Sequence, residues 1–353
     1  MKIALKIVKV VVGILFLLGF FYVLGPKVEK PNLDTVLPEV ETNLLALEKM
    51  IQEREQDISN LKPDNEARII WFDSIPAKTE YCIVYLHGWS ASQGEGSPLH
   101  TNIAKKYGCN LYLPRLAGHG IFEKEPMLTI TADALIDSAK EAIAIGKQLG
   151  KKVILMATST GGTLALHLAQ EDSDIAGMLL YSPNVEIYDK NAKLLAGPWG
   201  VNLAKIVKQS DYHEFEANEA RKKYWTHKYR VEALTHLQAL VDNTMVPETF
   251  EKITQPVFMG YFYKNDSIQD KVVSVPAMLE MFEQLGTKSN EKRKVAFPES
   301  NNHVMTSYIT SKDLASVEKE TQRFLEEILK MKSIDNQFVV EKVEKEQLQV
   351  HRP

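Results

Sequence analysis

The chain has 353 residues, of which 44% are hydrophobic and 25% are charged, and its net charge is −4. This composition is ordinary for a globular protein, and a chain of this length can bury a large core without disulfide bonds or structural metal ions. The charge balance offers no basic surface for nucleic acid, so we expect no such partner. The two cysteines, Cys82 and Cys109, have no histidine cluster near them. We therefore expect no metal site, and we interpret Cys82 as a buried, inert thiol.

The first 25 residues differ from the rest of the chain. Three lysines precede an uninterrupted apolar run from Val10 to Gly25. Extended by the two residues before Lys9, the run reaches the lower limit of about 17 residues for a membrane span. Residues 1–25 are therefore predicted to be an uncleaved anchor, which the bulky residues before Pro26 favour, or a cleaved signal that leaves a secreted protein. The lysines place the N-terminus in the cytoplasm and the remaining chain on the extracytoplasmic side.

Residues 26–66 are predicted to be a proline-containing tether followed by a solvated amphipathic helix from Glu41 to Gln56. Strands and helices then alternate, with strands expected at 68–72, 81–86, 109–114, 152–157, 175–181, 256–260 and 294–297, and helices at 131–149, 161–170, 275–285 and 314–331. This alternation predicts an α/β fold in which helices flank a mostly parallel sheet. Sites in such sheets lie at the carboxyl ends of the strands.

The clearest chemical motif is Ala157-Thr158-Ser159-Thr160-Gly161-Gly162, which leads from a strand into a helix. A serine on such a sharp turn presents its hydroxyl above the sheet, and the crowded turn requires small neighbours. The N-terminus of the following helix favours negative charge at the serine. We interpret Ser159 as a catalytic nucleophile. The alternative is a glycine-lined turn that only needs a small polar residue.

A second motif, Leu86-His87-Gly88-Trp89, ends an earlier strand. Acyl-transfer chemistry requires two backbone N–H groups directed at a developing oxyanion. We expect these to be the amides of Trp89 and Thr160. His87 itself is interpreted as a structural histidine that packs the loop.

The base and its orienting acid are expected after the last strands. His303 lies in the loop between the last strand and the last helix, which is the position of a catalytic base. The acid should follow the strand at 256–260, where two aspartates compete. Asp270 is favoured because it leads into an apolar stretch and then a helix. Asp266 is the alternative, although an aspartate in a polar loop is often only a turn former.

Taken together, the motifs resemble the α/β-hydrolase superfamily, in particular its carboxylesterase and monoacylglycerol-lipase-like branch. The resemblance covers residues 68–331 and rests on Leu86–Trp89, Leu113–Gly120, Ala157–Gly161, Asp270 with Val273, and His303 with Val304. It implies a serine carboxylester hydrolase that forms an acyl-enzyme, needs no cofactor and acts on a small-molecule or lipid-like ester. Ala157 replaces the usual first glycine, and the stretch from Gly260 to Asp270 is longer than usual, which affects the assignment of the acid.

The resemblance also implies a hydrolase core at 67–187 and 255–332, interrupted by a helical cap at 188–254. Trp199, Tyr212 and Trp225 of the cap are candidate substrate-binding residues, with packing of the cap onto the sheet as the alternative. The basic and aromatic residues at 221–230 could contact a lipid headgroup surface, but a solvated helix face is favoured. Residues 333–353 are expected to form a flexible tail.

Two other classes of function remain open at this stage. A thioesterase or an acyltransferase could use the same three residues, since chain order does not identify the acyl acceptor. A non-catalytic binding protein could keep the fold without the chemistry. The complete set of nucleophile, acid, base and oxyanion loops argues against the binding protein, because a scaffold does not need them together.

Overall fold

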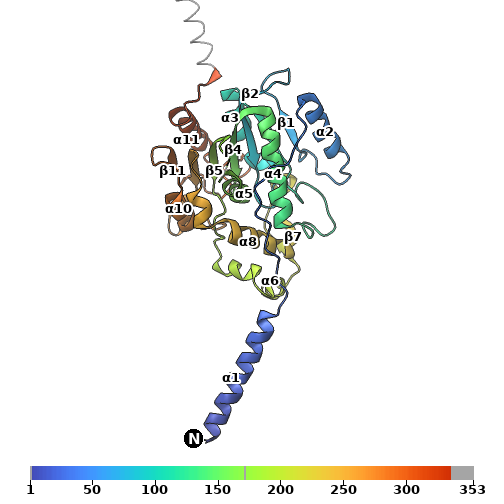
Figure 1. Cartoon of the computed structure of the whole chain (residues 1–353), viewed down its shortest axis with the longest axis vertical. Coiled ribbons are helices and arrows are strands. Elements are labelled where there is room, and N and C mark those ends of the chain that lie inside the picture. The colour runs from blue at the N-terminus through green and yellow to red at the C-terminus, as the bar shows by residue number, and fades with distance from the viewer. Residues whose placement is uncertain (1, 171, 335–353) are drawn as a thin grey trace, which may run out of the picture.

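The computed structural model describes residues 2–170 and 172–334. Helix α1 (Lys2–Val23) projects away from the folded body (Figure 1). Its stretch Leu5–Val23 is long and apolar enough to cross a membrane, and none of it is buried in protein. Where α1 ends, Trp199 of the body donates its backbone N–H to the Pro26 carbonyl at 2.7 Å. Most of the predicted tail, residues 335–353, lies outside the described residues.

The body is built on a seven-stranded sheet with the order β1-β3-β2-β4-β5-β8-β11. The strands are β1 (Arg68–Ile70), β2 (Thr79–Leu86), β3 (Asn110–Leu113), β4 (Gly150–Thr158), β5 (Ile175–Tyr181), β8 (Val257–Tyr261) and β11 (Lys292–Ala296). Only the edge strand β1 runs antiparallel to its neighbour, and all other pairs are parallel. The predicted α/β architecture with a mostly parallel sheet is confirmed.

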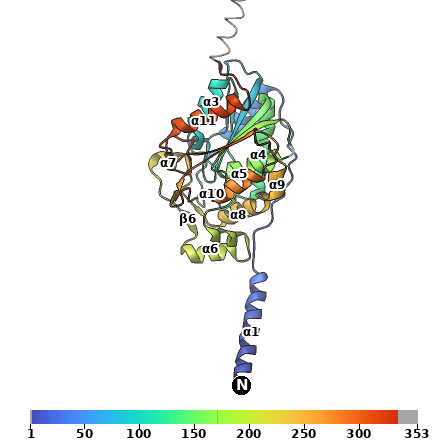
Figure 2. The same cartoon turned by 90° about the vertical axis from the view of Figure 1, so that its left-hand side faces the viewer.

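Helices cover both faces of the sheet, which explains why the strands are apolar throughout. Val84 and Leu155 point to one face, where they pack with α4 (Ala132–Leu149), α5 (Thr160–Ala169) and α10 (Val275–Gln284). Tyr85 and Met156 point to the other face, where they pack with α3 (Leu99–Tyr107) and α11 (Leu314–Glu327). These two helices lie together on that side of the sheet (Figure 2). Burying one such side chain contributes about 1.5–3 kcal/mol.

Helix α2 (Leu44–Gln56) docks on the body rather than standing in solvent as predicted. Leu47 and Ile51 on one of its faces are buried in the core. Glu55 on the same face is also buried and accepts from the Arg115 guanidinium at 2.7 Å. The helical periodicity was visible in the sequence, but the partner of the apolar face was not.

Between β5 and β8 the chain forms the cap, which lies at the α1 end of the body (Figure 1). Its elements are η2 (Lys190–Ala196), α6 (Gly200–Lys208), β6 (Tyr212–Glu214), α7 (Glu219–Tyr224), β7 (Lys228–Arg230), α8 (Glu232–Thr244) and α9 (Pro247–Glu251). Helices make up most of this segment, which also contains an antiparallel hairpin of β6 and β7 that was not predicted. His213 and Tyr229 face each other across it with ring centroids 5.1 Å apart, a cross-strand aromatic pair that stabilises such hairpins.

Candidate active site

Ser159 lies at the carboxyl end of β4 in a conformation that only a sharp turn demands. Its φ is 53° and its ψ is −118°, a region that costs an L-residue about 1–3 kcal/mol. Its N–H donates to the Tyr181 carbonyl at 3.0 Å, and its carbonyl accepts from the Asn184 N–H at 2.9 Å. A Cβ on Gly161 would lie 2.0 Å from the Leu86 carbonyl oxygen, so this position requires glycine. At the first small position, Ala157 fits fully buried.

Asp270 and His303 form a buried hydrogen-bonded pair. The His303 Nδ1 lies 2.6 Å from Asp270 Oδ2. The other carboxylate oxygen accepts from the backbone N–H groups of Val272 and Val273, at 2.8 and 3.2 Å. Burial by itself would raise the pKa of Asp270, but the positive charge of His303 and these hydrogen bonds outweigh it and lower the pKa. The carboxylate in turn overcomes the effect of burial on His303 and raises the pKa of the imidazole.

The competing aspartate, Asp266, lies elsewhere. Strands β9 (Tyr263–Asn265) and β10 (Ile268–Gln269) form a small antiparallel hairpin after β8, which accounts for the long stretch before Asp270. Asp266 is exposed at the hairpin tip and accepts from the Tyr263 hydroxyl at 2.8 Å. The hairpin returns the chain to the end of β8, where the Asp270 N–H donates to Phe262 at 3.0 Å. The structure therefore brings Asp270, and not Asp266, to His303.

The loop after β2 is held by two buried imidazoles. The His87 Nε2 accepts from the Leu116 N–H at 3.1 Å, and the His119 Nε2 accepts from the Ser90 N–H at 3.0 Å. Burial lowers the pKa of His119 to about 4 and that of His87 as well, so both rings stay neutral and act as acceptors. Within residues 2–170 and 172–334, no group accepts a hydrogen bond from the backbone N–H of Trp89.

Sequence reasoning missed Glu95, a buried carboxylate in η1 (Gln93–Gly96). Its Oε2 accepts from the Gly88 N–H at 2.5 Å and from the Tyr85 hydroxyl at 3.2 Å. A Cβ on Gly88 would lie 2.8 Å from Glu95 Oε1 and 3.1 Å from Ser159 Cβ, so Gly88 is enclosed between the carboxylate and the serine. One signal was available, since a lone acidic residue between two glycines, Gly94 and Gly96, follows a few residues after the Leu86–Trp89 motif.

The loop that carries His303 is tied to the same segment. The Thr306 hydroxyl donates to the Glu95 carbonyl at 2.8 Å, and the Ser307 hydroxyl donates to the Gly94 carbonyl at 3.0 Å. The Tyr85 hydroxyl also lies 3.0 Å from the hydroxyl of Thr158, next to Ser159, within hydrogen-bond distance. These bonds connect the three loops on which Ser159, His303 and Trp89 lie.

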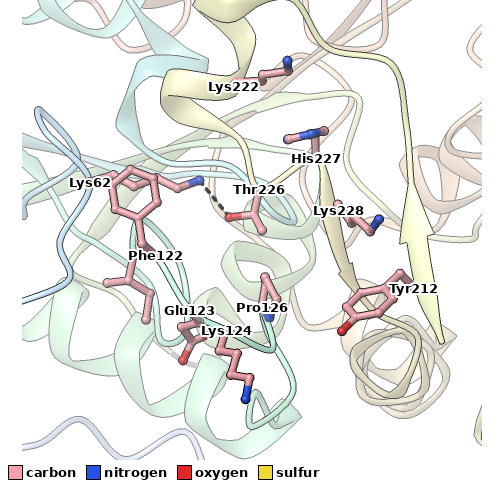
Figure 3. Close-up of a pocket in the computed structure, with 11 residues that line it drawn as sticks. Lys62, Phe122, Glu123, Lys124, Pro126, Tyr212, Lys222, Thr226, His227 and Lys228 are labelled. Carbon is pink, nitrogen blue, oxygen red and sulfur yellow. Dashed lines mark hydrogen bonds between the residues drawn. The ribbon is translucent and has the colours of Figure 1, made fainter.

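The three aromatic candidates of the cap have separate locations. Trp225 is buried and packs with Ala91 of the loop after β2 and with Val304 of the loop that carries His303. The Trp199 indole N–H donates to the Phe21 carbonyl of α1 at 3.3 Å. Tyr212 lines a cavity of about 550 Å³ between the cap and the loop around Phe122, and none of Ser159, Asp270 and His303 lines it (Figure 3). Of the three, only Trp225 packs against the loops of the candidate site.

Among the described residues, no cluster of three histidine, cysteine or acidic side chains could hold a metal ion. Both cysteines are buried and unpaired, and burial raises their pKa values, to about 12 for Cys109. Neither thiol belongs to the loops described above.

The carboxyl ends of the parallel strands thus carry a strained serine turn and lead to a buried histidine–aspartate pair. The chain belongs to the alpha/beta hydrolase family, whose model matches residues 83–308, more than half of its length. A thermostable monoacylglycerol lipase from Bacillus sp. (strain H-257) is 32% identical over 105 residues, which are 30% of this chain and 41% of that protein. The similarity thus spans less than half of that relative.

Solved structures show the same fold at low sequence identity. The structure of LipS and LipT, two metagenome-derived lipolytic enzymes, is 18% identical with a TM-score of 0.57, covering 75% of this chain and 98% of that one. A soluble variant of monoglyceride lipase from Saccharomyces cerevisiae, in complex with a substrate analogue, is 12% identical with a TM-score of 0.55, covering 84% and 98%. At these identities the likeness concerns the fold.

Replacing Glu95 with glutamine should make stability less dependent on pH. Burial raises the pKa of Glu95 from 4.5 to about 7, so the folded protein holds this proton more tightly than the unfolded chain does. The resulting stabilisation is present at low pH and is lost as the pH rises through about 7. Between about pH 5 and pH 8, the free energy of unfolding of the wild type should fall relative to E95Q by on the order of 3 kcal/mol.

Denaturant unfolding of both proteins in one neutral detergent, over a pH series, measures this difference. His303 is present in both proteins, so its own titration largely cancels. Glu299→Gln is the matched control, because Glu299 is exposed and pairs with Lys264 on the surface. A difference between wild type and E95Q that stays constant over the series would contradict the assignment.

Proposed function

We propose that the protein is a serine hydrolase that cleaves carboxylic esters through an acyl-enzyme. The observation that carries the proposal is the buried pair of Asp270 and His303 at the edge of the sheet where β4 delivers Ser159. Ser159 is the nucleophile, His303 the general base and Asp270 the acid that orients the imidazole. The free backbone N–H of Trp89 and that of Thr160, at the first turn of α5, stabilise the oxyanion.

The reaction follows from these assignments in two steps. The Ser159 hydroxyl attacks the ester carbonyl while His303 Nε2 takes its proton and passes it to the leaving alcohol. Water then attacks the acyl-enzyme, His303 takes a proton from the water, and the serine leaves as the hydroxyl. Asp270 accepts from Nδ1–H throughout, which keeps Nε2 free as the base and stabilises the imidazolium that forms.

The substrate is a small-molecule or lipid-like ester. This substrate class is supported by the partial match to a monoacylglycerol lipase and by the fold that lipolytic enzymes share. The cap adds aromatic residues such as Trp225 beside the loops of the site.

Ser159→Ala should abolish hydrolysis of p-nitrophenyl esters and labelling by a fluorophosphonate probe, because both need the hydroxyl. A residual acceleration of about 10³-fold over water can persist from the oxyanion hole. Ester assays and gel-based labelling provide the measurement. Ser267→Ala, an exposed serine of the β9–β10 hairpin, is the control and should behave as wild type. Full activity in Ser159→Ala would refute the proposed nucleophile.

The two aspartates should differ sharply when each is changed to asparagine. Asp270→Asn should lower kcat by about 10⁴ with KM nearly unchanged, because the amide stabilises the wrong imidazole tautomer. Asp266→Asn should stay within about tenfold of wild type, since it loses only an exposed hydrogen bond to Tyr263. Steady-state kinetics on one ester compare the two. The reverse pattern would make Asp266 the acid.

For the N-terminal helix we propose an uncleaved anchor that leaves the hydrolase body on the extracytoplasmic side. The apolar stretch Leu5–Val23 supports a span, and the lysines before it support the orientation. From Asn32 on the chain is already docked, since the Asn32 N–H donates to Asp133 at 2.7 Å and Lys140 donates to Asp34 at 2.8 Å.

The full chain should therefore sediment with membranes, whereas a chain that starts at Asn32 should be soluble and should hydrolyse esters. Fractionation of cells that express each form, followed by an ester assay, tests this. Protease added to intact cells or spheroplasts should reach the hydrolase body of the full chain. A mature N-terminus near residue 26 would instead indicate a cleaved signal and a secreted enzyme.

A further inference from the structure

Arg221 of the cap forms no ion pair with any residue that the structure describes. Its guanidinium carbon lies over the Phe215 ring, 4.7 Å from the ring centroid, and over the Trp225 ring, 5.6 Å from that centroid. Among the described residues no carboxylate forms an ion pair with it, and its buried Nε has no acceptor. A buried donor without an acceptor is costly, and arginine is suited to bind planar anions through its fixed fork of N–H groups.

The side chain lies beside the candidate site. Arg221 lines a pocket of about 470 Å³ together with Asn218, Ile309, Thr310 and Asn302, the residue before His303. Trp225, on which Arg221 stacks, packs against Val304, the residue after His303. The positive charge of Arg221 also acts on the His303 imidazole. It opposes protonation and so reduces the rise in the pKa of His303 that Asp270 causes. A group held by Arg221 would therefore lie beside the loop that carries His303.

The neighbouring lysines of the cap differ from Arg221 because each forms an ion pair with a carboxylate. Lys222 pairs with Glu219 at 2.9 Å, and Lys228 pairs with Glu214 at 3.3 Å, both at the cavity of Figure 3. The exposed carboxylate of Glu216 lines the pocket of Arg221 but does not form an ion pair with it. Buried Glu95 attracts Arg221 over a longer distance, again without an ion pair. Among the described residues, the two terminal nitrogens of Arg221 have no hydrogen-bond partner and are available to a ligand, whereas the Nε is enclosed by protein.

We propose that Arg221 binds a carboxylate or another anionic oxygen group of the substrate, so that the enzyme prefers esters that carry a negative charge near the scissile bond. This inference rests on the proposed hydrolase function and names its substrate class. The rings of Phe215 and Trp225 pack against the guanidinium, and Asn218 and Asn302 offer further polar groups to the anion.

Two matched pairs of esters test the proposal on the full chain in neutral detergent. Mono-4-nitrophenyl adipate against 4-nitrophenyl hexanoate places the charge on the acyl side. 4-(Butanoyloxy)benzoate against its methyl ester places it on the alcohol side. In at least one pair the wild type should favour the anionic ester, and Arg221→Gln should lower the ratio of kcat/KM for the anionic to the neutral ester by about 10- to 100-fold. Lys222→Gln, which removes a charge from the same helix, should keep the wild-type ratio.

Three results would overturn the inference. The ratio could be the same in the wild type and Arg221→Gln for both pairs, or the wild type could show no preference. Alternatively, Arg221→Gln could lower activity on both esters by the same factor, which indicates a structural role or an effect on His303 alone. In each case hydrolysis of neutral esters and fluorophosphonate labelling by the wild type would leave the hydrolase proposal standing. A wild type that neither hydrolyses esters nor reacts with the probe would overturn both proposals.

Discussion

The hydrogen bond between Asp270 and His303 joins two ionisable groups that burial alone would neutralise. It persists because the negative charge of Asp270 stabilises protonated His303 and the positive charge of His303 stabilises ionised Asp270. Two backbone N–H groups also donate to the second carboxylate oxygen. The pair can form only if β8 and β11 lie side by side, since each strand delivers one of the two residues to the same edge. The parallel pairing of β8 and β11 is thus a condition for this hydrogen bond.

Glu95 shows how sensitive this balance is. Like Asp270 it is buried and interacts electrostatically with His303, yet burial dominates and raises its pKa, whereas the pKa of Asp270 is lowered. Asp270 accepts two backbone N–H groups and touches the imidazole directly. Glu95 accepts one backbone N–H and the Tyr85 hydroxyl, and the imidazole acts on it only through its charge. The two carboxylates lie near the same imidazole, but they accept different hydrogen bonds, and their pKa values therefore shift in opposite directions.

The sequence predicted the sheet because strands buried on both faces leave continuous apolar runs, and it placed Ser159 and His303 because turns after strands have local signatures. Short hairpins and single contacts leave no such signature and were not predicted. The β6–β7 hairpin consists of short segments, and the hairpin before Asp270 looked like a long loop, which left Asp266 in competition. Glu95 was missed because its importance comes from the Gly88 N–H, a contact that no periodicity reveals.

The bonds from Thr306 to Glu95 and from Ser307 to Gly94 join residues 211 and 213 positions apart in the chain. Synthesis begins at the N-terminus, so the loop around Glu95 leaves the ribosome long before its partners exist. Ser159 likewise precedes both Asp270 and His303 in the order of synthesis. A growing chain therefore has neither the Asp270–His303 pair nor the bonds from Thr306 and Ser307 until β11 and the loop after it have emerged from the ribosome.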